Sequence, residues 1–100
     1  MGKLVRDRIP ELICARGDRP VTRVLDGPGF EAALLAKVVE QAEELRDTTP
    51  EGRLEEAADV YEVLLALTRH LGLSLEDVAR RAELKRAERG GFDRRVWLES

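Results

Sequence analysis

Residues 37–67 read KVVEQAEELRDTTPEGRLEEAADVYEVLLAL, two segments with periodic apolar residues on either side of a short polar turn. Apolar residues recur three or four positions apart in both segments, which predicts two amphipathic helices. Each predicted helix also carries a cluster of acids, namely Glu40, Glu43 and Glu44 on the first and Glu55, Glu56 and Asp59 on the second. If the helices pack antiparallel, these carboxylates converge and repel one another unless a positive charge, such as a hard divalent cation, lies between them.

The apolar spacing predicts which side of each helix meets the core. The first helix is expected from Phe30 to Asp47 and the second from Pro50 to Leu71, where Gly72 supplies a stop. The predicted core stripes are Leu34, Leu35, Val38, Ala42 and Leu45 on the first helix, and Leu54, Tyr61, Leu64, Leu65, Thr68 and Leu71 on the second. A different stripe of the second helix places Glu56 and Asp59 beside valines and leucines, where a carboxylate is costly unless it is paired or bound to a metal.

The flanking segments predict further short elements. Pro10 to Arg16 is expected to form a short helix, and Ser74 opens another that extends to Arg89, since an acid follows the serine by three residues. Apolar and polar residues alternate near 21–26 and 92–98, and these segments are expected to form at most a short two-stranded β ribbon. The sequence therefore predicts one mainly all-α domain over residues 1–100, a bundle of four to five helices.

Composition limits the partners and the location. The chain has 100 residues and a net charge of -3, without the basic excess that general binding to a nucleic-acid polymer requires. A helical domain this small often completes its burial by forming a homo-oligomer, here expected to be a dimer or tetramer. Cys14 is the single cysteine, which excludes an internal disulfide. The sequence shows neither a signal-peptide pattern nor an apolar run long enough to span a membrane, so a cytoplasmic protein without a membrane partner is expected.

The acidic pattern resembles a known enzyme motif. The segments KVVEQAEEL and EEAADVYEVLLAL are similar to the paired signature of the all-α nucleoside triphosphate pyrophosphohydrolase superfamily, which includes MazG-type and phosphoribosyl-ATP pyrophosphohydrolase-like proteins. That signature reads E-E-x-x-E, a spacer, and then E-x-x-D. Glu40, Gln41 and Glu44 match its first part, and Glu56 and Asp59 match its second part. KLVRDRIPELI and KRAERGGFDRRVWL also resemble a small single-domain branch of this superfamily, so the likeness covers nearly the whole chain and implies a MazG-like fold.

The resemblance implies hydrolysis of a nucleotide between its α and β phosphates, giving a nucleoside monophosphate and pyrophosphate. By matching position, the catalytic and metal-binding residues would be Glu40, Glu44, Glu56 and Asp59, holding Mg²⁺ with Mn²⁺ as a substitute. Metal-bound water would be the nucleophile, and a carboxylate would accept its proton. Gln41 departs from the pattern, because an amide can coordinate a cation but cannot act as a base. The number of ions and the identity of the base therefore stay open.

The phosphates of such a substrate also need positive charge. The candidates are Lys37, one turn before Gln41, and the basic residues of the two flanks, Arg6, Arg8, Lys85 and Arg89. Two alternatives to a general nucleotide pyrophosphohydrolase remain. One is the phosphoribosyl-ATP pyrophosphohydrolase of histidine synthesis, and the other is a non-catalytic helical module for oligomerisation or regulation.

Overall fold

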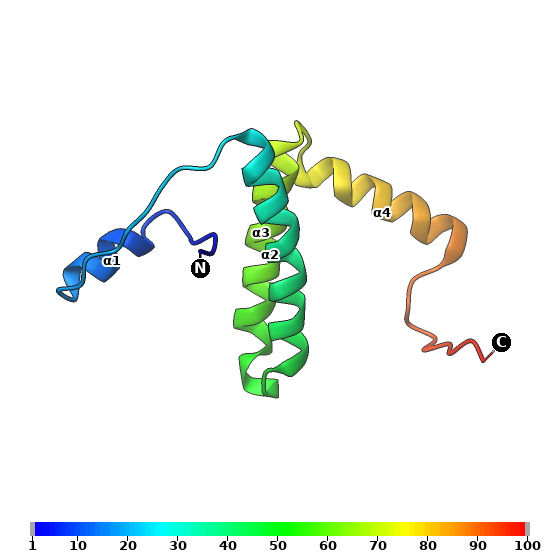
Figure 1. Ribbon diagram of the computed structural model, residues 1–100. Coiled ribbons are helices and arrows are strands. Elements are labelled where there is room, and N and C mark those ends of the chain that lie inside the picture. The colour runs from blue at the N-terminus through cyan, green and yellow to red at the C-terminus, as the bar shows by residue number, and fades with distance from the viewer. Residues whose placement is uncertain (1, 100) are drawn as a thin grey trace.

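The computed structural model describes residues 2–99, and within that range the chain is all-α (Figure 1). Its elements are α1 (Ile9–Ala15), α2 (Gly27–Asp47), the 3₁₀ turn η1 (Pro50–Gly52), α3 (Arg53–His70) and α4 (Leu75–Arg89). The prediction of an all-α chain is confirmed. The predicted β ribbon is wrong, because residues 2–99 contain no strand and both segments are irregular. Val24 is 97% exposed and Phe92 96% exposed, so neither segment has the neighbouring surface that a two-stranded ribbon needs.

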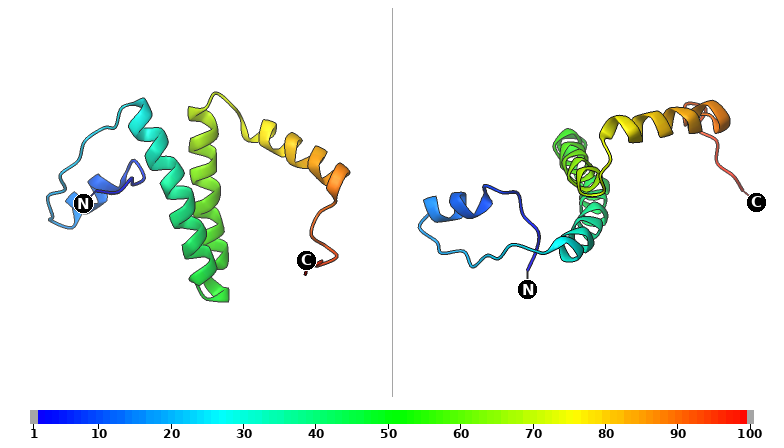
Figure 2. Two further views of the ribbon diagram at one scale, coloured as in Figure 1. Left: turned by 45° about the vertical axis from the view of Figure 1, so that its right-hand side comes forward. Right: turned by 90° about the horizontal axis from the view of Figure 1, so that it is seen from above.

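A hairpin of α2 and α3 forms the centre of the molecule. The two helices run side by side and antiparallel, while α1 and α4 extend to opposite sides of them (Figures 1 and 2). The radius of gyration is 17.3 Å, against about 13 Å for a compact domain of 100 residues. The four helices of one chain therefore do not close into the predicted bundle, since α2 and α3 alone pack along their length.

The turn between α2 and α3 is held by the side chain of Arg53. Its Nε donates to the carbonyl of Leu45 at 3.1 Å, and its Nη2 donates to the carbonyl of Thr48 at 3.2 Å. These carbonyls lie at the end of α2, where the helix itself supplies no donors. Gly52 fits closely against this turn, because a Cβ at that position would collide with the Thr48 hydroxyl. Both ends of the connection are thus fixed by local contacts.

The helix starts follow from capping. The α2 helix begins at Gly27, three residues earlier than expected, because the Asp26 carboxylate accepts from the Gly29 N–H at 2.7 Å and Pro28 occupies the first turn. The predicted start of α4 is confirmed: the Ser74 hydroxyl accepts from the Asp77 N–H, and the Asp77 carboxylate accepts from the Ser74 N–H. The α3 helix ends before Gly72, whose φ of 76° suits glycine.

The predicted core stripe of α3 is largely wrong. Of its members, Thr68 is buried and Leu65 half-buried, but Leu54 is 79% exposed and Tyr61 59% exposed, and the other two leucines are exposed as well. The side of α3 that faces α2 is instead the stripe beside Glu56, where Val60, Val63 and Leu67 are half-buried. Two apolar stripes run along α3, and α2 covers the one that also carries the acids.

The stripe predicted for α2 is right in part. Leu34 is buried at 2% exposure, and Val38 and Leu45 are half-buried, whereas Leu35 and Ala42 are exposed. The helix is therefore rotated slightly from the expected orientation. None of the helices in the described part of the chain is both long and apolar enough to cross a membrane.

Candidate metal and phosphate site

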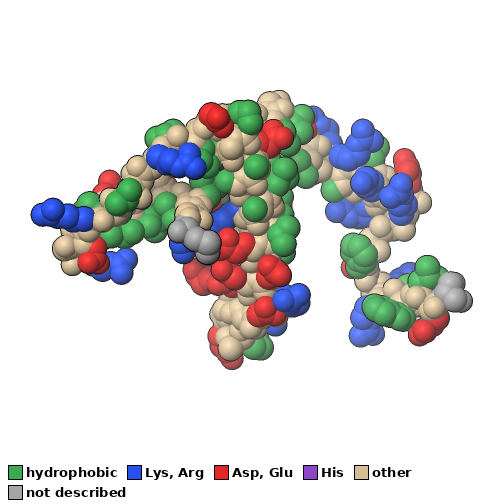
Figure 3. Space-filling view, in the orientation of Figure 1, with side chains coloured by type: hydrophobic (Ala, Val, Ile, Leu, Met, Phe, Trp, Pro, Cys, Tyr) green, Lys and Arg blue, Asp and Glu red, His purple; other side chains and the backbone are tan. Residues whose placement is uncertain are grey.

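A cleft of about 1100 Å³ lies between the α2–α3 hairpin and the N-terminal segment that includes α1. Its acidic wall is formed by Glu40 and Glu44 of α2 and by Asp59 and Glu62 of α3. Figure 3 shows acidic side chains gathered on the hairpin beside the N-terminal segment. Glu40 and Glu44 are four residues apart, and Asp59 and Glu62 three apart, so each pair shares one side of its helix. The antiparallel hairpin then brings the two pairs to the same cleft, as predicted for three of these four residues.

Glu56 lies three residues before Asp59 on α3, and it does not line the cleft, although it is half-buried beside it. Its Oε2 atom is buried and has no hydrogen-bond partner. Burial of this carboxyl, followed by the negative charges of Glu44 and Asp59, raises the pKa of Glu56 above the ordinary glutamate value. A buried carboxylate oxygen without a donor is rare in folded proteins. The acidic cluster therefore includes one carboxyl group whose charged form its surroundings disfavour.

The N-terminal segment reaches the acids through Arg6. Its Nη2 atom lies 2.7 Å from Oδ1 of Asp59, 53 residues later in the chain. Lys37 also lines the cleft, and its Nζ is 3.4 Å from Oε1 of Glu40. Two of the five predicted phosphate-binding residues are thus placed directly beside the acidic wall.

The other three predicted phosphate-binding residues lie elsewhere in the single chain. The Arg8 guanidinium is 2.7 Å from Glu11 on α1, and Arg8 does not line the cleft. Lys85 and Arg89 are exposed on α4, which leads away from the hairpin. Within one chain these three residues are therefore not brought to the cleft, and their role in binding phosphate stays a prediction.

Sequence reasoning also missed parts of the cleft. Beyond the acids, the cleft is lined by the basic residues Lys3, Arg16 and Arg69 and by an apolar group of Ile9, Ile13, Phe30, Leu34, Val63 and Ala66. Glu62 was detectable, because it follows Asp59 by three residues on the same helix. The apolar group joins three distant segments, and only the fold brings them together. The cleft therefore offers a charged part and an apolar part.

The donor set fits a hard cation such as Mg²⁺. Carboxylate oxygens are the protein ligands that this ion prefers, and the Oε2 atom of Glu56 is buried without a hydrogen-bond partner. Within residues 2–99, no three acidic, histidine or cysteine side chains already surround a common point. Asp59 and Glu40 are instead paired with Arg6 and Lys37.

Comparison with known proteins finds a relative whose function is not described. The chain is 46% identical over 70 residues to an uncharacterised protein of Mycolicibacterium smegmatis. The match covers 70% of this chain, and it spans 61% of the length of that relative. No protein-family model matches the sequence, and no solved structure matches it. The chemistry of the cleft therefore carries the functional argument.

Proposed function

We propose that this protein is a nucleotide pyrophosphohydrolase that cleaves a nucleoside triphosphate or a related nucleotide between the α and β phosphates. The observation that carries the proposal is the Glu56 side chain, whose Oε2 atom is buried without a hydrogen-bond partner beside the acids Glu44 and Asp59. A purely structural helix pair gains nothing from burying such a group, because an uncompensated carboxylate destabilises the fold. A divalent cation held by substrate and protein together would remove that penalty.

The residues that would hold Mg²⁺, or Mn²⁺ in its place, are Glu40, Glu44, Glu56 and Asp59. When bound, the ion would lower the pKa of a coordinated water and neutralise phosphate charge. The resemblance to MazG-type enzymes supports the same four residues, and the bundle of that fold would form only through further chains. Gln41, buried at 6% exposure and lining the cleft, stands where the motif has a glutamate. Its amide can bind an oxygen or a cation, so the proton of the attacking water goes to one of the carboxylates.

The remaining parts of the cleft match the other parts of a nucleotide. Lys37 and Arg6 supply positive charge beside the acids, where they can bind phosphate oxygens. The apolar group around Phe30 and Val63 can receive a base or another flat apolar moiety. Because nucleotides of this kind are intracellular metabolites, the proposal includes a cytoplasmic location.

The test is pyrophosphate release from a panel of nucleoside triphosphates with Mg²⁺ present. Glu56→Gln and Asp59→Asn should each abolish turnover while circular dichroism shows the helical content of the wild type. Glu55→Gln is the matched control, since Glu55 is an exposed neighbour on the same helix. Wild-type activity in either of the first two variants would rule out the metal assignment.

The same panel separates the alternatives. Release confined to phosphoribosyl-ATP would identify the enzyme of histidine synthesis. Absence of release from every nucleotide, with intact fold and metal present, would favour a non-catalytic helical module.

A further inference from the structure

Two basic side chains of the cleft are paired with two of the acids that the proposed chemistry uses. Nη2 of Arg6 lies 2.7 Å from Oδ1 of Asp59, and Nζ of Lys37 lies 3.4 Å from Oε1 of Glu40. The first pair joins the N-terminal segment to α3, and the second joins neighbouring turns of α2. Each pair therefore engages a carboxylate oxygen that a divalent ion would need.

The charges that line the cleft are balanced among the described residues. The acids are Asp7, Glu40, Glu44, Asp59 and Glu62, and the bases are Lys3, Arg6, Arg16, Lys37 and Arg69. With equal numbers of each sign, this lining gives little net attraction to a divalent ion that enters alone, or to a polyphosphate that enters alone. A divalent ion and a polyphosphate that enter together bring a partner for each sign of charge.

Both basic side chains are free to change partners without a change in the fold. The side chains of Arg6 and Asp59 are 58% and 38% exposed, and an ion pair of this exposure is weak. Lys37 is less exposed, but its four-carbon stem is flexible, so its ammonium group can reach more than one position. Because both side chains line the same cleft as the acids, a ligand bound there lies within their reach.

We propose that Arg6 and Lys37 are exchangeable counter-ions. They neutralise Asp59 and Glu40 in the free protein, and they move to the phosphates of a nucleotide when a divalent ion replaces them at the carboxylates. This exchange rests on the proposed function, which places the metal ligands and the phosphates in the cleft. It adds a regulatory property to that site: a nucleotide raises the affinity for the ion, and the ion raises the affinity for the nucleotide by the same factor.

The coupling has a physical source in the contacts of Arg6. An ion that displaces Arg6 without a nucleotide leaves the guanidinium group without an anionic partner. A nucleotide that draws Arg6 away without an ion leaves the Asp59 carboxylate beside phosphates of the same sign. Joint binding avoids both costs, because the guanidinium group then binds phosphate oxygens while the carboxylate binds the ion.

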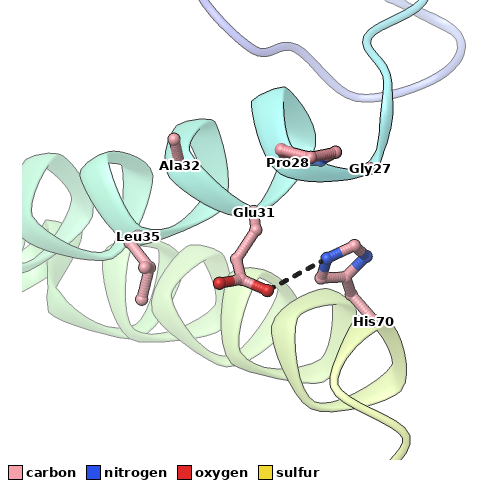
Figure 4. A pocket seen from close by; sticks show the side chains of 6 residues that line it. All are labelled: Gly27, Pro28, Glu31, Ala32, Leu35 and His70. Atoms are coloured by element: carbon pink, nitrogen blue, oxygen red, sulfur yellow. Dashed lines mark ion pairs between the residues drawn. The ribbon is translucent and has the colours of Figure 1, made fainter.

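A further pair between α2 and α3 provides a control. Glu31 points from α2 toward His70 of α3, with 3.3 Å between Oε1 and Nε2 (Figure 4). Glu31 lines a separate hollow of about 540 Å³ together with Pro28 and Leu35, and it does not line the cleft. Its side chain is 46% exposed, close to the 45% of Glu40. Glu31→Gln therefore removes a charge of similar exposure from the same helix without breaking either pair of the proposed exchange.

The experiment is calorimetric titration of the full chain with α,β-methylene-ATP, once with a chelator and once with saturating Mn²⁺. The ratio of the two dissociation constants is the coupling factor, and the same ratio is measured for each variant. Arg6→Gln should lower the coupling factor by up to about fivefold, the upper range for an exposed ion pair. Lys37→Gln should lower it in the same direction. Because Mn²⁺ binds the analogue in solution equally in every titration, differences between variants report on the protein.

Conservative and neighbouring substitutions separate this exchange from a structural role. Arg6→Lys keeps the positive charge and should keep most of the coupling. Arg8→Gln, in the same segment but paired with Glu11 and outside the cleft, should leave the coupling unchanged, as should Glu31→Gln. Equal coupling in the wild type and Arg6→Gln would overturn the exchange and leave the proposed hydrolysis standing. A wild type that binds neither Mn²⁺ nor the analogue would overturn both.

Discussion

Replacing Glu56 by glutamine should stabilise the metal-free protein at neutral pH. The change keeps the shape of the side chain and removes a charge that burial, Glu44 and Asp59 disfavour. Because the pKa of Glu56 is raised in the folded state, the folded chain binds this proton more tightly than the unfolded chain does. The contribution of Glu56 to stability is then favourable at low pH and is lost as pH rises from the unfolded pKa through the raised folded pKa.

The assay is thermal unfolding followed by circular dichroism, with a chelator present. At pH 7 the Glu56→Gln variant should melt above the wild type. Near pH 3.5, below the ordinary glutamate pKa of about 4.3, the two should melt together, because Glu56 is protonated in both states. Glu55→Gln, which removes an exposed charge from the same turn, should change the melting temperature much less.

Adding Mn²⁺ at pH 7 should reverse the order of the melting temperatures, so that the wild type melts above the Glu56→Gln variant. At a free concentration 100 times the dissociation constant, a single site that binds only the folded state contributes about 2.7 kcal/mol. For a domain of about 100 residues, each kcal/mol shifts the melting temperature by about 4–8 °C, so the wild type should gain roughly 10–20 °C. The variant should gain far less. Equal stabilisation of both proteins, or a variant that melts below the wild type without metal at pH 7, would refute the reasoning.

Two other predictions follow from single contacts. Arg6→Gln should raise Mn²⁺ affinity up to about fivefold in calorimetry, because an exposed ion pair of up to about 1 kcal/mol no longer competes for Asp59. A lower affinity in the variant would contradict competition between Arg6 and Mn²⁺ for Asp59. Leu34→Ala should lower the free energy of unfolding in urea by about 2–3 kcal/mol, the lower part of the range for buried leucines, because its surroundings are only partly buried. Leu84→Ala should change that free energy little, and equal losses would contradict the assigned core.

The sequence located the helices well because their ends depend on local chemistry. The Ser74 capping box and the stop at Gly72 need only neighbouring residues, and both were predicted. The start of α2 was misjudged, because Asp26-Gly27-Pro28-Gly29 suits either a turn or a capped helix start. Local signals in the sequence therefore predict that a helix forms more reliably than they predict the residue at which it begins.

The side of a helix that is buried depends on the helix that packs against it. The spacing of apolar residues alone did not predict which side of α3 is buried. The apolar stripe through Tyr61 is as regular as the stripe through Val63, and only the position of α2 decides which one it covers. Three of the acids at the cleft were predicted, because the i, i+4 pair Glu40 and Glu44 on α2 and the position of Asp59 on α3 survive any small rotation of the hairpin. The contact of Arg6 with Asp59 has no local signal, since 53 residues separate them.

The hydrogen bonds from the Arg53 side chain to the carbonyls at the end of α2 also affect the folding pathway. They close a connection of few residues, and contacts close in sequence form early in folding. The α2–α3 hairpin should therefore form before the N-terminal segment and α4 reach their folded positions. Hairpin closure is also the event that brings Glu44 beside Glu56, so the electrostatic repulsion of the site opposes an early step on the folding pathway. Metal ions in the refolding solution would then act on the rate of folding as well as on the final stability.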